Sequence, residues 1–82
     1  MDTTNVKDFG HSADVQIQLW VNGHVLPVSQ LGLDFLVLKE PTDHPPAEAE
    51  IAMSVDGRES RWSVYLPAGL AVAERRTRIT RR

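Results

Sequence analysis

Side chains that could hold a metal ion gather at one point of the 82-residue chain, in the segment "TDHPPAEAE". It contains Asp43, His44, Glu48 and Glu50, whose oxygen and nitrogen atoms are common ligands of divalent cations. The other two histidines lie far from this segment in the sequence, and no two histidines have the i, i+2 or i, i+4 spacing of a metal-binding pair. Nothing in the segment holds the ligands in place, so we expect a solvated acidic loop with no metal and no cofactor.

The residue types of nucleophilic catalysis are present, but not in a catalytic arrangement. The chain has no cysteine and no G-x-S-x-G motif. Four of its serines lie in strand-like stretches: Ser29, Ser54, Ser60 and Ser63. There is also no glycine-rich phosphate loop, and 82 residues leave little volume for a ligand pocket. We therefore expect no enzymatic activity.

Arginine dominates the last eight residues, "RRTRITRR", which contain no acid. They carry a formal charge of +5, whereas residues 1–74 carry four cations against all eleven acids of the chain, a charge of −7. A guanidinium forms paired hydrogen bonds with a carboxylate or a phosphate. This tail is therefore solvated, folds back on the acidic body, or contacts the phosphates of a nucleic acid or cyclic dinucleotide. The residues concerned are Arg75, Arg76, Arg78, Arg81 and Arg82.

The strongest structural pattern lies in "VQIQLWVNGHVLPVS", where apolar and polar residues alternate. Asn22-Gly23 interrupts the alternation with a pair that tolerates the positive φ angles of a type I′ turn. A two-residue turn places Leu19 opposite Leu26 and Ile17 opposite Val28, on one apolar face. The segment thus predicts a β-hairpin.

A second hairpin is predicted in "AEIAMSVDGRESRWSVYLP", with its turn at Asp56-Gly57. The two-residue turn places Ile51 opposite Trp62 and Ala49 opposite Val64, so one face is apolar and the other suits water. We assign Trp62 to the core.

Trp20 is the candidate for a protein-binding surface. In the first predicted hairpin it lies opposite Val25 and near Pro27, on the face away from the apolar stripe. We expect the C-terminal segment to cover its indole. The alternative is an exposed aromatic patch of Trp20, Val25 and Pro27, of a kind that binds partner proteins.

The elements together predict an all-β fold, a small antiparallel barrel or sandwich of about five to six short strands built from these two hairpins. Residues 1–12 are expected to form a flexible N-terminal segment, 13–72 a single β domain, and 73–82 an arginine-rich C-terminal tail or last irregular strand. The apolar run "LDFLVLKE" (33–40) is a further strand. If its edge is open, a second copy would add there; the alternative is a central place in the sheet, or a larger partner protein.

At "PVSQLGLDFLVL" the chain resembles the PilZ family, small β-barrels that often bind cyclic di-GMP. Ser29 and Gly32 match the S-x-x-G half of the family's [D/N]-x-S-x-x-G element, and an apolar strand follows. Pro27 stands at the Asp/Asn position, and no R-x-x-x-R precedes the element. Arg78 and Arg82 have that spacing, but at the other end of the chain. The resemblance therefore implies a related barrel layout without the family's arginine pair.

The N-terminal stretch "MDTTNVKDFGHSADV" has one lysine and no apolar run, so it predicts neither a secretion signal nor a membrane span. The absence of cysteine fits a reducing compartment. We expect a cytoplasmic, non-catalytic binding or interaction module that self-associates or binds a larger protein. The alternative is a phosphate-reading module that acts through the C-terminal arginines; nucleic acid is the less favoured partner because the net charge is −2.

Overall fold

The computed structural model describes residues 14–82, so the segment predicted over 1–12 lies outside the described part. The described residues form an all-β fold without a helix, as predicted, but with seven strands rather than five to six. The difference arises in the last eight residues, which supply two short strands. In chain order the strands are β2 (Val15–Val21), β3 (His24–Leu31), β4 (Phe35–Leu38), β5 (Ala47–Val55), β6 (Arg58–Leu66), β7 (Arg76–Arg78) and β8 (Thr80–Arg81).

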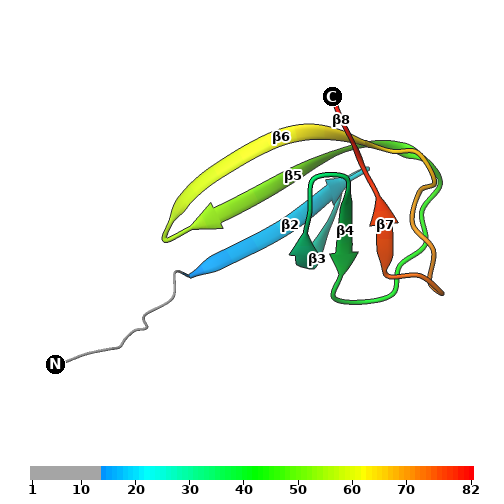
Figure 1. Ribbon diagram of the computed structural model, residues 1–82, viewed down its shortest axis with the longest axis horizontal. Helices are drawn as coiled ribbons and strands as arrows, with labels where there is room; N and C mark the ends of the chain where they lie inside the picture. Colours follow the sequence, from blue (N-terminus) through cyan, green and yellow to red (C-terminus); the bar gives the residue numbers. More distant parts are fainter. Residues whose placement is uncertain (1–13) are drawn as a thin grey trace, which may run out of the picture.

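The seven strands form one antiparallel sheet in the order β7-β4-β3-β2-β5-β6-β8. β7 pairs with β4 at one end of this order, and β8 pairs with β6 at the other. Only Ile79 separates β7 from β8 in the sequence. The last segment of the chain therefore joins the two ends of the sheet and curls it into a nearly closed barrel (Figure 1).

Both predicted turns are present. Asn22 and Gly23 have φ angles of 51° and 82°, and Asp56 and Gly57 have 51° and 85°, which are the positive values of a type I′ turn. The second hairpin has the predicted register, with Ile51 opposite Trp62 and Ala49 opposite Val64.

The first hairpin keeps the predicted register only as far as Pro27. Leu19 pairs with Leu26, and Gln18 with Pro27. The predicted pairing of Ile17 with Val28 is absent, because β3 leaves β2 there and pairs with β4 from Val28 onward, with a bulge after that residue. Proline lacks a backbone N–H, which suits a place where a ladder is interrupted.

The core fills the closed part of the barrel. Its most deeply buried side chains come from β2, β4, β5 and β6, and Ile79 adds to them from the last segment. Trp62, which we assigned to the core, packs against this cluster but is only partly buried. The buried cluster consists of Leu19, Val21, Val28, Leu36, Leu38, Ile51, Val64, Leu66, Leu70 and Ile79.

β4 lies inside the sheet rather than at an edge. It pairs with β3 on one side and with β7 on the other. The edge over 33–40 to which we expected a second copy to add is therefore closed. The short β7 covers this edge. The sequence contains little sign of β7, because the strand itself has no apolar residue and only Ile79, directly after it, is apolar.

β2, β5 and β6 extend beyond the strands that would cover them (Figure 1). β5 and β6 have nine residues each, whereas β4 has four. Among residues 14–82, nothing forms an opposing layer over part of the concave face of this extension. The candidate site lies on this face.

Candidate functional site

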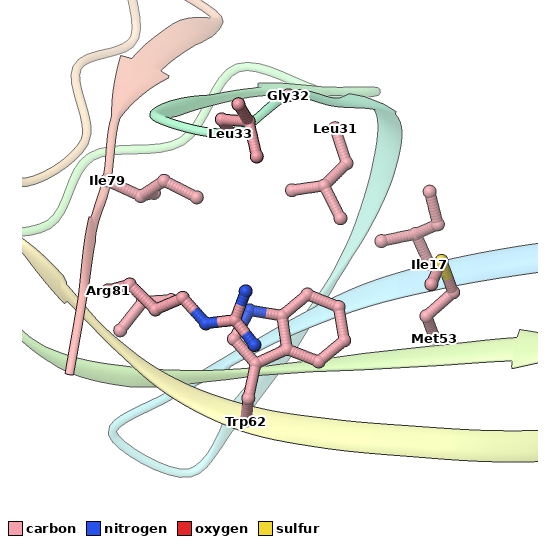
Figure 2. Close-up of a pocket in the computed structure, with 9 residues that line it drawn as sticks. Ile17, Leu31, Gly32, Leu33, Met53, Trp62, Ile79 and Arg81 are labelled. Carbon is pink, nitrogen blue, oxygen red and sulfur yellow. The ribbon is translucent and has the colours of Figure 1, made fainter.

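An apolar groove of about 460 Å³ lies where the extended strands leave the closed part of the barrel. One wall comes from β2, β5 and β6. The opposite wall comes from the turn between β3 and β4, and the last segment of the chain adds one end (Figure 2). The lining residues are Ile17, Leu31, Gly32, Leu33, Met53, Trp62, Val64, Ile79 and Arg81.

Strand alternation explains the first wall. Side chains two residues apart in a strand point to the same face. The inward-facing residues deep in the barrel are fully buried, with no exposed surface on Leu19, Ile51 or Val64. The next inward residue of each strand lies outside the closed part and stays only partly buried: Ile17, Met53 and Trp62. The groove is thus a continuation of the core beyond the point where the barrel closes.

The turn between β3 and β4 forms the second wall. The Gly32 backbone N–H donates a hydrogen bond to the Phe35 carbonyl oxygen at 2.9 Å. A Cβ atom at Gly32 would lie 2.0 Å from the Phe35 ring, so the tight approach requires glycine. Leu33, the next residue, is 95% exposed at the rim of the groove. The tight turn thus presents an apolar side chain to solvent at the rim of the groove.

Among the described residues that line the groove, Arg81 alone is charged. Its guanidinium carbon lies 5.5 Å from the centroid of the Trp62 ring, within the range of a cation–π contact, and Figure 2 shows the two side by side. In residues 14–82 no carboxylate lies within ion-pair distance of Arg81. The groove can therefore hold an apolar group and place a cation next to it.

The C-terminal arginines do not gather at one site. Arg76 stacks on Phe35 at 4.1 Å, and Arg82 pairs with Glu48 and stacks on Tyr65. Arg75 donates a hydrogen bond to the Lys39 carbonyl oxygen at 3.3 Å, and Arg78 lines a shallow hollow together with Arg76. This segment folds back on the body of the protein. Side chains alternate in direction along it, so Arg81 points to the groove while Thr80 and Arg82 point outward.

The structure brings Trp20, Val25 and Pro27 together on the outer face of β2 and β3. Trp20 and Val25 are cross-strand partners with exposures of 39% and 42%. The expected cover by the C-terminal segment is absent. Instead, Arg61 of β6 stacks on the indole of Trp20 at 4.5 Å, and the indole N–H donates to the Gln18 side chain at 3.3 Å.

The acidic segment around His44 has structural contacts. A carboxylate oxygen of Asp43 accepts a hydrogen bond from the Val72 N–H, and the His44 backbone pairs with Leu70. Glu48 and Glu50 pair with arginines. Over residues 14–82 no three histidine or carboxylate side chains gather closely enough to hold a metal ion.

Comparison of the chain with models of protein families, with curated proteins and with solved structures finds no match. The resemblance to the PilZ family rests on Ser29 and Gly32. The Ser29 hydroxyl donates to the Val37 carbonyl oxygen at 3.1 Å, and Gly32 permits the approach to Phe35, so both have structural roles. In the described part of the chain, no helix has the length and apolar character of a membrane span.

The groove is absent from the sequence-based predictions, although the sequence contains a signal for it. Ile17 and Met53 continue the inward alternation past the last pair that β3 covers. The length of the second hairpin is a second sign of the groove. Its strands β5 and β6 have nine residues each, more than the four-residue β4 can cover. Both signs are lost when every inward-facing residue is assigned to the core.

Proposed function

We propose that the protein is a non-catalytic binding module whose groove takes an extended, acidic peptide segment of a partner protein. The observation that carries the proposal is the cation of Arg81, which stacks on Trp62 at the wall of an otherwise apolar groove.

The apolar lining supplies the affinity. Full burial of one leucine or isoleucine side chain is worth about 1.5–3 kcal/mol. Leu33 and Met53 lie on opposite walls, so an apolar side chain inserted between the walls would cover surface that is now exposed.

Arg81 supplies the selectivity. A carboxylate next to the inserted side chain would accept charge-assisted hydrogen bonds from the guanidinium of Arg81, which is exposed at the groove wall. A basic segment would be repelled by the same charge. Charge complementarity therefore favours an acidic ligand.

The backbone of β2 explains why an extended peptide suits the groove. Val21 and His24 flank a two-residue turn and form a hydrogen-bonded pair. Backbone groups alternate in direction along a strand, so the N–H and C=O of Ile17 point, like those of Val21, to the β3 side of β2. At this position β3 no longer pairs with β2. A peptide strand could pair there and direct every second side chain into the groove.

Selection from a random peptide library on the full-length protein tests the proposal. We expect the selected peptides to combine a large aliphatic residue with a nearby aspartate or glutamate. Arg81→Gln should weaken the binding of these peptides about tenfold, equivalent to about 1.4 kcal/mol. Arg78→Gln, which removes the same charge from the outer face, should leave the affinity unchanged. Selected peptides without acids, or equal losses in both variants, would refute the proposal.

A second candidate function is phosphate binding by Arg76 and Arg78. Both are exposed, and both line the hollow beside Phe35. Glu74 and Asp34 line the same hollow and oppose an anion, which is why this candidate ranks second. Retention on a heparin column tests it: Arg76→Gln with Arg78→Gln should elute at lower salt than the wild type, whereas Arg81→Gln should not.

A further inference from the structure

Within the described part of the chain, one edge of β6 is covered only near its C-terminal end. β5 pairs with all nine residues of β6 on one side. On the other side β8 pairs only with Val64 and Tyr65, and the Arg82 N–H donates to the Ser63 carbonyl oxygen. Within residues 14–82, the first five residues of β6, 58–62, have no strand on their outer side.

The turn fixes which backbone groups face outward. Val55 and Arg58 flank the two-residue turn and form a hydrogen-bonded pair with β5. The pattern alternates, so Ser60 also points its N–H and C=O to β5. Glu59 and Arg61 point theirs to the open edge, in agreement with the outward carbonyl of Ser63 two residues further on.

We infer that this edge pairs with the same edge of a second copy, about a two-fold axis at Ser60. Glu59 then lies opposite the partner's Arg61, and Arg61 opposite the partner's Glu59. The outward N–H and C=O groups of these residues form four hydrogen bonds. Within its own chain Arg61 already lies 3.5 Å from Glu59 and 3.4 Å from Glu50, so the partner's Glu59 joins an existing ion-pair cluster on each side of the axis. This inference does not depend on the proposed function of the groove.

Charge decides the register. An axis at Glu59 would place two carboxylates directly opposite each other, and an axis at Arg61 would place two guanidinium groups opposite each other; both arrangements are destabilising. If the pairing shifted by one residue, backbone groups that face the open edge would lie opposite groups of the partner that face its own β5. The axis at Ser60 alone satisfies both the backbone and the charges, and it also sets Arg58 opposite the partner's Trp62, a cation next to an aromatic ring.

The contact is short, because β8 ends the open edge at Ser63. Five residues from each copy bury less than a standard interface, which predicts a weak dimer with a dissociation constant in the micromolar range. Its ion pairs are exposed, so added salt should weaken it further.

Sedimentation equilibrium of the full-length protein between about 10 and 500 μM tests the dimer. Glu59→Arg puts like charges opposite each other and should raise the dissociation constant at least tenfold. Glu59→Arg with Arg61→Glu exchanges the charges and should restore association. Glu74→Arg is the matched control, since it makes the same charge change at an exposed residue away from the edge and should leave association unchanged. A wild type that stays monomeric up to the highest concentration, or a double variant no better than Glu59→Arg, overturns the inference.

Cysteine cross-linking tests the position of the axis. Ser60 would face the same residue of the partner as a non-hydrogen-bonded pair, whose Cα separation of about 4.5 Å permits a disulfide. The chain has no cysteine of its own. Ser60→Cys should therefore oxidise to a covalent dimer at least tenfold faster than Ser63→Cys, an exposed position on the same strand. Equal rates in the two variants would contradict the pairing.

Discussion

At the scale of single residues, the two turns depend on backbone angles that few side chains adopt. Gly57 has a φ of 85°, and no atom lies within 4 Å of the position that a Cβ would take there. Gly57→Val should therefore lower the free energy of unfolding through the backbone alone, by about 1–2 kcal/mol. Gly57→Asn should lower it less, because asparagine tolerates positive φ. Urea unfolding followed by circular dichroism measures both, and equal losses would point away from the turn conformation.

Thr77 carries a buried hydrogen bond that holds the last segment to the loop before it. It is 8% exposed, and its hydroxyl donates to the Gly69 carbonyl oxygen at 2.7 Å. Thr77→Val keeps the shape but leaves that carbonyl without its partner, so we expect a loss of about 1–3 kcal/mol in the free energy of unfolding. Thr80→Val, at an exposed position, is the control. The hydrogen bond would be unimportant if the two variants had the same urea midpoint.

The two tryptophans should differ in their contribution to stability. Trp62 packs against the core from the groove, whereas Trp20 is 39% exposed under Arg61. Because Trp62 is only partly buried, Trp62→Ala should cost about 2–3 kcal/mol rather than the larger loss of a fully buried ring. Trp20→Ala should cost less. Thermal unfolding of the two variants gives the order, and the reverse order would mean that the stack on Trp20 is worth more than the groove wall.

At the scale of elements, β7 and β8 hold the barrel closed. They pair with opposite ends of the sheet and place Ile79, 4% exposed, in the core. Deletion of residues 75–82 should therefore abolish cooperative unfolding, since the domain is small and its stability margin is narrow. Arg76→Gln with Arg78→Gln keeps both strands and should remain folded. A truncated chain that still unfolded cooperatively would show that closure is dispensable.

The hairpins could be predicted because their signals are local. Asn22-Gly23 and Asp56-Gly57 each specify a turn, and the turn then fixes the register of the residues beside it. β7 and β8 could not be predicted in the same way. They contain three and two residues, and they are strands only because β4 and β6 lie next to them. Their pairing depends on contacts between residues far apart in the sequence.

The same limit explains what could be predicted of the site. A single hairpin positions Trp20, Val25 and Pro27, so their common surface could be predicted from the sequence. The groove is lined by five separate elements of the chain, so no local pattern contains it. The sequence shows the arginines as one basic group, and only the pairing of β7 and β8 shows that Arg81 points inward.

At the scale of the whole molecule, three surfaces are candidate binding sites: the groove, the patch around Trp20 and the hollow beside Phe35. Each contains an arginine next to an aromatic ring. The groove differs because its arginine has no described carboxylate partner and its walls are apolar. This combination makes it the best match for a ligand with an apolar part and an acid.

NMR titration of the isotope-labelled protein with 8-anilinonaphthalene-1-sulfonate tests this claim most directly, because the probe joins an aromatic surface to one negative charge. We predict that the largest shift changes fall on the Trp62 indole N–H, the Met53 methyl group and the amides of Ile79 and Arg81. In Arg81→Gln these changes should need about tenfold more probe. Shift changes centred on Trp20 or on Arg76 and Arg78, with those of the groove residues unmoved, would contradict the assignment of the groove as the binding site.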